Sequence, residues 1–471
     1  MSNKKIYSSL VDRGNQTGEV ISTDRFLAIV KGLDKIMIGA MVVFENGQDG
    51  IVQGVREDFV EVLSLSSEII EIGNLVVAKT DKLSIGVSEG LLGRIINPLG
   101  HPIDGKGIVR KAKDQDVFSE ALDFKNRAIL STQLETGVTL VDTLFPIVYG
   151  QRIAIMGDSK SGKTTFLSQL AINQAKKGKI IVYVLIGKRK PDVEILINRF
   201  EKEKVSSKIV FVLADVFDSL PLTYLAPYSG CAVAEYLWQA GNDVIIIYDD
   251  LSNHAKAYRE LSLILRKNPG REAYPGDMFY AHSSLLERAG KMESNGKTLT
   301  SLPISVTPND DITGFLSTTL ISITDGQLIF DNSIMRSGIK PAINVGLSVS
   351  RVGGRGQTKN ARYLARIISS YLANYRLTLE SSRFVSEQSN ETKSTLRIGS
   401  RIYDIFGQSP HELFTLIEEQ IMLKVALGSG SLDTLDVAKL KSIVKNLPLK
   451  DKVDTNIESI SEKIIQSGLK G

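Results

Sequence analysis

The run from Gly157 to Thr164 constrains this chain more than any other stretch, because it matches the phosphate-loop pattern G-x-x-x-x-G-K-[ST]. Such a loop wraps the phosphates of a nucleotide with backbone N–H groups, and its glycines let it turn tightly and approach the ligand closely. Lys163 is expected to reach the β- and γ-phosphates, and the Thr164 hydroxyl is expected to ligate Mg²⁺. The run therefore predicts a site for ATP or ADP with Mg²⁺.

The segments on either side of the loop support this interpretation over a chance match. Residues 151–156 are apolar and strand-like, and residues 165–172 have helical spacing, so the phosphates would lie at a helix N-terminus, which favours anions. The residues predicted to contact the nucleotide here are Gly157, Asp158, Ser159, Lys160, Ser161, Gly162, Lys163, Thr164 and Thr165.

Length and composition describe a soluble protein of roughly three domains. Lys and Arg number 57 against 53 Asp and Glu, so the net charge of +4 requires neither a nucleic acid nor an anionic membrane as partner. Apolar runs such as residues 180–186 fall far short of the roughly 20 residues that span a bilayer. Any membrane association is therefore expected only through partner subunits. A single cysteine, Cys231, excludes an intrachain disulfide.

Residues 1–80 are predicted to form an N-terminal β-barrel, because short β segments separated by turn residues follow one another with no helix between them. The predicted strands are residues 19–23, 26–30, 41–45, 50–55, 59–63 and 74–78. The stretch lacks the aromatics and the basic stripe of a nucleic-acid-binding barrel, which favours a structural role.

The rest of the chain is predicted to form two further domains. Residues 81–360 begin with a Gly/Pro-rich connector and then alternate strands and helices, which is typical of a mostly parallel sheet with helices on both faces, the α/β P-loop (RecA-like) architecture. Residues 361–471 show apolar residues at helical spacing and are predicted to form a C-terminal helical bundle.

The second half of a nucleotide site should come from a neighbouring strand that ends in a carboxylate. Residues 244–250 supply a buried-strand pattern, and Asp249 directly ends its apolar run, so Asp249 is the predicted Mg²⁺ ligand; a strand cap is the alternative. Another strand, residues 181–187, is followed by Lys188 where a group that activates water is often found. An ammonium has no lone pair with which to take a proton from water. The sequence thus predicts nucleotide binding without a catalytic base.

The order of these blocks resembles the alpha subunit of F-type ATP synthases over nearly the whole chain. The stretches that carry the resemblance are the phosphate loop and residues 90–94, 102–107, 247–252, 269–277, 321–327 and 341–353. The resemblance implies a ring in which three such chains alternate with three catalytic beta-type subunits around a central gamma-type stalk. It also implies a peripheral location on the cytoplasmic face of the cell membrane, held there by partner subunits.

The resemblance further implies roles for single residues. Alpha subunits bind Mg-ATP without turning it over, and the catalytic beta chain carries Gly-Glu-Arg where this chain has Gly187-Lys188-Arg189. Arg351 matches the family's arginine finger, which reaches the γ-phosphate in the neighbouring beta subunit; a surface ion pair is the alternative.

Several positions depart from the alpha pattern. Lys160 and Lys188 stand where the family usually has Gln, and both are predicted to lie near the phosphates. Lys340, followed by Pro341, replaces an adenine-contacting arginine, and the glutamine pair expected before Pro410 is not clearly present. The shorter N-terminal helix suggests a specialised F-type-like ATPase with a different stator, not coupled to proton translocation.

Three other functions fit the sequence less well than the one that the resemblance implies. An autonomous export-type hexameric ATPase would need a carboxylate at Lys188, and an RNA-translocating helicase would need stacking aromatics in the barrel. A purely structural subunit with a decayed site conflicts with the intact loop and with Asp249.

Overall fold

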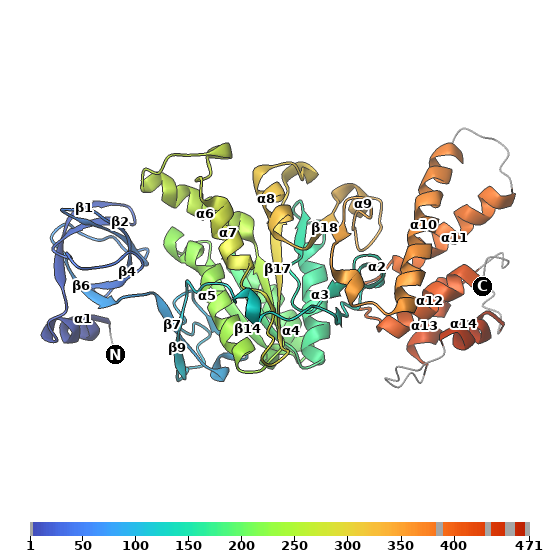
Figure 1. Cartoon of the computed structure of the whole chain (residues 1–471), viewed down its shortest axis with the longest axis horizontal. Coiled ribbons are helices and arrows are strands. Elements are labelled where there is room, and N and C mark those ends of the chain that lie inside the picture. Colours follow the sequence, from blue (N-terminus) through green and yellow to red (C-terminus); the bar gives the residue numbers. More distant parts are fainter. Residues whose placement is uncertain (1–2, 383–389, 429–434, 448–456, 467–471) are drawn as a thin grey trace. The chain divides into compact units, whose positions relative to one another are not determined.

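The structure is a computed structural model that describes residues 3–382, 390–428, 435–447 and 457–466 (Figure 1). The chain forms two compact units, each built from separate segments. The first unit comprises Met1–Ala128, Gly178–Thr307 and Asp311–Thr324. The second comprises Ile129–Lys177, Pro308–Asp310 and Asp325–Gly471.

The first unit begins with a helix, α1 (Asn3–Asp12), and a closed antiparallel barrel whose strand order is β1-β2-β5-β4-β3-β6. Its strands are β1 (Thr17–Asp24), β2 (Leu27–Lys31), β3 (Met41–Phe44), β4 (Asp49–Val55), β5 (Val60–Ser64) and β6 (Leu75–Thr80). Pairing of β1 with β6 closes the sheet and leaves no edge strand open. The predicted six-stranded barrel is confirmed; α1 was not predicted.

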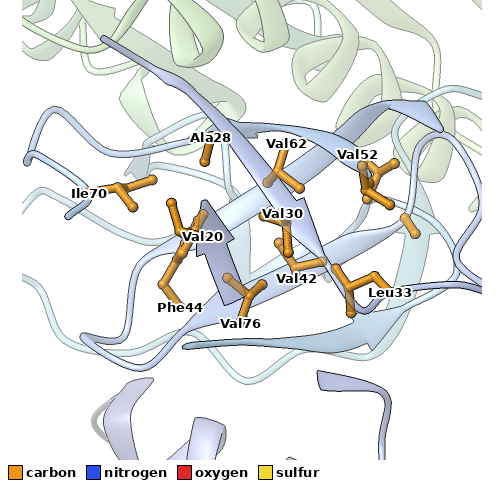
Figure 2. Packing of buried hydrophobic residues seen from close by; sticks show 12 residues of the cluster. Val20, Ala28, Val30, Leu33, Val42, Phe44, Val52, Val62, Ile70 and Val76 are labelled. Carbon is orange, nitrogen blue, oxygen red and sulfur yellow. The ribbon is translucent and has the colours of Figure 1, made fainter. Parts of the chain in front are cut away.

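The barrel is held together by small branched side chains that point inward (Figure 2). Alternation places every second residue of a strand inside, so that Val20, Val30, Val42 and Val62 are fully buried. Phe44 fills the space that these valines leave and is also fully buried. The interior of the barrel is therefore filled by apolar side chains.

A parallel sheet forms the second part of the first unit. β13 lies between β14 and β15, β17 continues the sheet beside β15, and β8 continues it beside β14. These strands are β8 (Ile95–Ile96), β13 (Ile180–Lys188), β14 (Ile209–Asp215), β15 (Val244–Asp249) and β17 (Thr298–Val306). The first seven residues of β13 are all buried, which explains the continuous apolar run in the sequence.

Helices and short antiparallel strands complete the first unit. The helices are α4 (Lys190–Lys202), α5 (Leu220–Gln239), α6 (Leu251–Ile264), α7 (Met278–Leu286) and α8 (Phe315–Ile323). The strands β7 (Ser84–Val87) and β9 (Lys113–Asp116) pair with each other, and β16 (Gly290–Lys291) pairs with β17. Helix α5 packs closely on β13, and Gly230 makes this close approach possible. A Cβ at Gly230 would lie only 2.3 Å from the Val184 side chain.

A buried ion pair ties α5 to the end of α7. The Arg288 guanidinium donates to both carboxylate oxygens of Glu235, at 2.8 and 2.5 Å, and to the Val117 carbonyl at 2.8 Å. The Arg288 side chain is 1% exposed, so its charge depends wholly on these partners. Removing one partner of such a pair leaves an uncompensated charge in the interior.

We therefore expect Glu235→Gln to lower the free energy of unfolding by about 3–5 kcal/mol. The single tryptophan, Trp238, is buried one turn further along α5, so its fluorescence during urea unfolding reports on this region. Glu260→Gln is the matched control, since it breaks the exposed pair with Arg25 and should cost less than about 1 kcal/mol. Equal unfolding midpoints for the two variants would contradict this account.

The second unit contains the phosphate loop between a strand and a helix. β12 (Ala154–Gly157) pairs in parallel with β18 (Gly326–Phe330), and β19 (Val349–Ser350) pairs antiparallel with β18. Its other elements before the C-terminal helices are β10 (Gln133–Leu134), α2 (Thr139–Leu144), β11 (Ile147–Val148), α3 (Lys163–Lys176) and α9 (Asn332–Arg336). The parallel strands in both units confirm the predicted α/β class.

The chain ends in helices, as predicted. They are α10 (Lys359–Ser382), α11 (Asn390–Phe406), α12 (Leu416–Gly428), α13 (Val437–Lys445) and α14 (Ile457–Gln466). Their buried apolar side chains, such as Leu364, Ile402 and Leu423, lie among neighbouring helices of the bundle. Within the described residues, none of the helices is both long enough and apolar enough to cross a bilayer.

Candidate nucleotide-binding site

The phosphate loop has the geometry that its sequence predicts. It leaves β12 at Gly157 and enters α3 at Lys163, with Gly162 as the N-cap in the left-handed region at φ +100°. A Cβ at Gly157 would lie 2.4 Å from the Phe330 carbonyl oxygen on β18, so only glycine fits there. The loop thus leads directly into the N-terminus of a 14-residue helix. The free N–H groups and the dipole of this helix favour the binding of a phosphate there.

Side chains around the loop divide into buried and accessible groups. Ser161 is fully buried and Lys163 is 7% exposed, whereas Ser159, Lys160, Thr164 and Thr165 are exposed. The hydroxyl-bearing residues at the start of α3 are therefore accessible from solvent.

The Lys163 ammonium lies within the loop itself. It donates to the carbonyls of Gly157 and Asp158 at 2.8 and 2.7 Å, and it lies 3.3 Å from the Ser161 hydroxyl. These contacts hold a positive charge against the turn of the loop. The arrangement can supply charge-assisted hydrogen bonds to a phosphate, as the motif predicts.

A second contact of the loop was missed by the sequence reasoning. The Asp158 carboxylate accepts from the backbone N–H of Asn309 at 3.0 Å, and the Asp310 carboxylate accepts from the N–H of Asp158 at 3.4 Å. Asn309 and Asp310 both have positive φ, a conformation that is uncommon for residues other than glycine. These reciprocal bonds restrain the variable part of the loop; residues about 150 positions apart gave no sequence signal for them.

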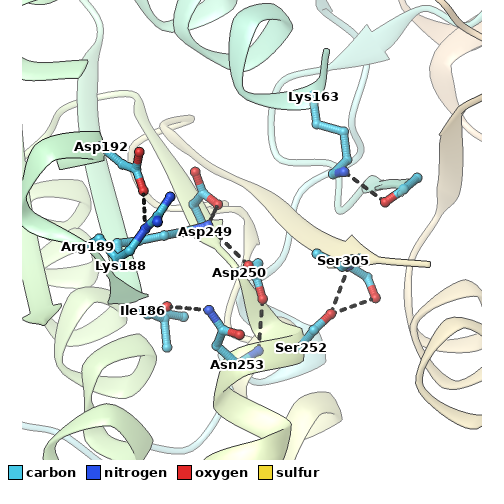
Figure 3. Close-up of polar contacts among 12 residues, drawn as sticks. Lys163, Ile186, Lys188, Arg189, Asp192, Asp249, Asp250, Ser252, Asn253 and Ser305 are labelled. Carbon is cyan, nitrogen blue, oxygen red and sulfur yellow. Dashed lines mark hydrogen bonds and ion pairs between the residues drawn. The ribbon is translucent and has the colours of Figure 1, made fainter. Parts of the chain in front are cut away.

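The first unit contains two other predicted site residues, Lys188 and Asp249, at the ends of two neighbouring strands (Figure 3). Lys188 ends β13, Asp249 ends β15, and Asp250 follows as the N-cap of α6, accepting from the Asn253 N–H at 2.8 Å. The Lys188 ammonium lies 2.6 Å from Asp249 Oδ1 and 3.1 Å from Asp250 Oδ2. The Tyr183 hydroxyl donates to the other oxygen of Asp249 at 3.2 Å.

Both carboxylates of this cluster are buried, and the Lys188 side chain is largely buried. Burial alone would lower the pKa of Lys188, but the two carboxylates more than offset this effect and raise the pKa above its ordinary value. Lys188 is therefore protonated at neutral pH and has no lone pair for a water molecule. The roles of Asp250 and Tyr183 were not predicted, although the Asp-Leu-Ser-Asn sequence at 250–253 is a recognisable helix start.

The two predicted Mg²⁺ ligands, Thr164 and Asp249, differ in how well they could bind the ion. The Thr164 hydroxyl is exposed and suits an ion held with the phosphates. The Asp249 carboxylate is 5% exposed and already meets an ammonium, so it does not suit a divalent cation in this arrangement. Among the residues that the structure describes, no group of three or more His, Cys, Asp or Glu side chains could hold a metal ion.

Lys340 and Pro341 lie in the second unit, and Lys340 lines a cavity of about 560 Å³ together with Tyr403 and Lys441. The Lys340 carbonyl accepts from the Gln408 N–H at 2.8 Å. The Gln408 side chain is buried: its oxygen accepts from the Thr139 N–H at 3.1 Å, and its amide donates to main-chain carbonyls. Gln408 thus fastens α2 to the segment after α11, a structural role.

Arg351 follows β19 on a strongly anchored segment. Its N–H donates to the Asp325 carbonyl at 3.0 Å, and the preceding Ser350 hydroxyl donates to the Pro146 carbonyl at 2.6 Å. A Cβ at Gly353 would lie 1.7 Å from that same carbonyl oxygen, which makes glycine necessary. The backbone is thus fixed on both sides, and the Arg351 side chain is exposed.

The predicted site residues therefore fall into two groups. The loop, Lys340, Pro341 and Arg351 belong to the second unit, and Lys188 with Asp249 belongs to the first. Within each group the structure places the residues at the ends of strands or the start of a helix, where the sequence predicts them.

Comparison with known proteins adds a decisive observation. Residues 137–350 match the family model of the "ATP synthase alpha/beta family, nucleotide-binding domain". Residues 357–469 match the model of the "ATP synthase alpha/beta chain, C terminal domain". ATP synthase subunit alpha of Caldanaerobacter subterraneus subsp. tengcongensis is 40% identical over 435 residues, which cover 92% of this chain and 86% of the relative. The chain belongs to the family of F-type ATP synthase alpha subunits.

A second relative extends the match. ATP synthase subunit alpha of Clostridium botulinum (strain Hall) is 38% identical over 453 residues, which cover 96% of this chain and 89% of the relative. The barrel, the α/β core and the helical end therefore all lie within an alpha-type match. The resemblance inferred from the motifs is confirmed.

Proposed function

We propose that this chain is a non-catalytic, nucleotide-binding alpha-type subunit of a rotary F-type ATP synthase or ATPase. The observation that carries the proposal is a well-formed phosphate loop in a chain whose strand β13 ends in an ion-paired lysine. The loop supplies what phosphate binding requires, and Lys188 supplies nothing that could activate water.

The nucleotide, ATP or ADP, would be held by the loop residues from Gly157 to Thr165. Lys163 and the N-terminus of α3 would meet the phosphates, and the exposed Thr164 hydroxyl would face the accompanying Mg²⁺. Mg²⁺ itself would offset phosphate charge. Lys340 and Pro341 would lie toward the base; a lysine there keeps a cation but lacks the planar fork of arginine, so adenine selectivity is expected to be weak.

In the assembly that we propose, three copies alternate with three catalytic beta-type subunits around a gamma-type central stalk. The complex would sit on the cytoplasmic face of the cell membrane, and this chain would reach the membrane only through partner subunits. Arg351 would point at the partner's catalytic site. A specialised complex that is not coupled to proton translocation would use this chain in the same way, and identifying the subunits of the purified native complex distinguishes the two.

An autonomous export-type ATPase is the competing function. It would need a carboxylate or amide near the γ-phosphate to orient water. The two candidate carboxylates of the first unit, Asp249 and Asp250, are each 5% exposed and share the Lys188 ammonium. This geometry disfavours the autonomous enzyme.

The binding role is tested by titrating the isolated chain with a fluorescent ATP analogue in the presence of Mg²⁺. Lys163→Ala should weaken binding by about 10- to 100-fold, since a hydrogen bond to a charged group contributes about 1.5–3 kcal/mol. Lys176→Ala, an exposed lysine at the far end of the same helix, is the matched control and should bind as wild type does. Saturable binding that Lys163→Ala leaves unchanged would refute the proposed site.

A further inference from the structure

Gln151, three residues before β12 in the second unit, contacts both the residue before Arg351 and the residue that binds the Arg351 N–H. The Gln151 side chain is fully buried. Its amide nitrogen donates to the Ser350 hydroxyl at 3.3 Å and to the Asp325 carbonyl at 3.4 Å. Its amide oxygen accepts from the Val148 N–H at 3.0 Å, so both polar atoms of the buried amide have partners.

Arg152, the next residue, holds Asp325 from a second direction. Its main-chain N–H donates to Asp325 Oδ2 at 3.0 Å, and its guanidinium donates to Oδ2 at 3.2 Å and to Oδ1 at 3.0 Å. The Asp325 N–H donates in return to the Arg152 carbonyl at 2.8 Å. A forked pair of this kind fixes the orientation of a carboxylate as well as its distance. It therefore also fixes the Asp325 carbonyl, which accepts from the Arg351 N–H at 3.0 Å.

The Ser350 hydroxyl completes this network on the other side of the Arg351 N–H. It accepts from Gln151 and from the Gly353 N–H at 3.2 Å, and it donates to the Pro146 carbonyl at 2.6 Å. The one donor and both lone pairs of the hydroxyl are thus in use. Because a misplacement of about 1 Å can lower a catalytic rate about 100-fold, the contacts that fix this main chain matter for any chemistry of the Arg351 guanidinium.

We propose that Gln151 and Arg152 are positioning residues for Arg351, which hold the main chain from which its guanidinium reaches the nucleotide of a neighbouring subunit. This role rests on the arginine-finger function proposed for Arg351 and deepens it, because it names the side chains on which that function depends. Gln151 and Arg152 act through Ser350 and Asp325, and neither is required to touch the nucleotide itself.

The test measures kcat and KM for ATP hydrolysis by the reconstituted hexamer, with a sizing run that verifies assembly. Gln151→Met keeps the approximate shape of the side chain but cannot donate a hydrogen bond, so kcat should fall about 10- to 100-fold. KM should stay within about twofold, because a misplaced finger loses an interaction made in the transition state. Arg152→Gln breaks the pair with Asp325 at a side chain that is 22% exposed. It should lower kcat in the same way, and it tests the proposal even where Gln151→Met does not assemble.

A double variant distinguishes positioning from a general loss of structure. In an Arg351→Ala complex, Gln151→Met should lower the residual kcat, measured with radiolabelled ATP, by less than about twofold, because an absent finger cannot be misplaced. Gln174→Met is the matched control and should have a kcat close to wild type. Gln174 is also fully buried in the second unit, but its amide bonds Tyr149 and Glu135 instead.

The outcomes separate the positioning role from the finger itself. Wild-type kcat in assembled Gln151→Met or Arg152→Gln complexes, beside an impaired Arg351→Ala complex, would overturn the positioning role and leave the finger intact. Equal losses from Gln151→Met with and without Arg351 would overturn it as well. Wild-type kcat in an assembled Arg351→Ala complex would refute the finger, and the positioning role with it.

Discussion

Replacing Arg351 by alanine is expected to lower ATP turnover by the reconstituted hexamer about 10³- to 10⁵-fold, the range that arginine fingers contribute elsewhere. A guanidinium that enters from a neighbouring subunit neutralises the charge that develops on the transferring phosphoryl group. Arg351 suits this role because its side chain is exposed while its backbone is fixed by Ser350, Gly353 and the Asp325 carbonyl. The phosphate loop of the Arg351→Ala chain should bind nucleotide nearly as in the wild type.

Two further variants make this prediction specific. Arg351→Lys keeps the charge but loses the planar fork of donors, so it should also be severely impaired. Arg355→Ala removes another exposed guanidinium from the same segment and should leave turnover close to wild type. The measurements are steady-state hydrolysis by the complex and a sizing run that verifies assembly. Wild-type turnover in an assembled Arg351→Ala complex would show that Arg351 contributes no chemistry.

The sequence alone predicted the elements that depend on local patterns. Short β segments separated by turn residues predicted the barrel strands to within a few residues, because strand and turn signals depend on residues that are close in the sequence. The phosphate loop was placed between a strand and a helix for the same reason: Gly157 and Gly162 occupy conformations that few other residues adopt.

The features that sequence reasoning missed depend on contacts between distant segments. The anchoring of Asp158 by Asn309 and Asp310 joins residues about 150 positions apart, and the buried Gln408 contact to Thr139 joins residues 269 positions apart. That Lys188 lies near the phosphates stays a prediction. The structure pairs Lys188 with Asp249 and Asp250, because parallel strands bring their carboxyl ends to the same edge. Only the three-dimensional register makes that pairing evident.

The isolated chain is expected to bind Mg-ATP without turning it over. Hydrolysis requires a group that orients or deprotonates water, and such a group contributes about 10²–10⁴ in rate. At the end of β13 this chain has a protonated lysine, and the nearest carboxylates are buried in the ion pair with it. The arginine finger of this chain would act on the nucleotide of the partner subunit. The isolated chain therefore has no arginine finger that acts on the nucleotide bound by its own phosphate loop.

Steady-state ATP hydrolysis by the purified chain, free of any beta-type subunit, tests this account most directly. Lys163→Ala measured in parallel identifies contaminating activity, because a contaminant would be indifferent to that change. We expect a rate that is indistinguishable between wild type and Lys163→Ala and negligible beside that of the assembled complex. Fast hydrolysis by wild type that Lys163→Ala abolishes would contradict it and place a catalytic site in this chain.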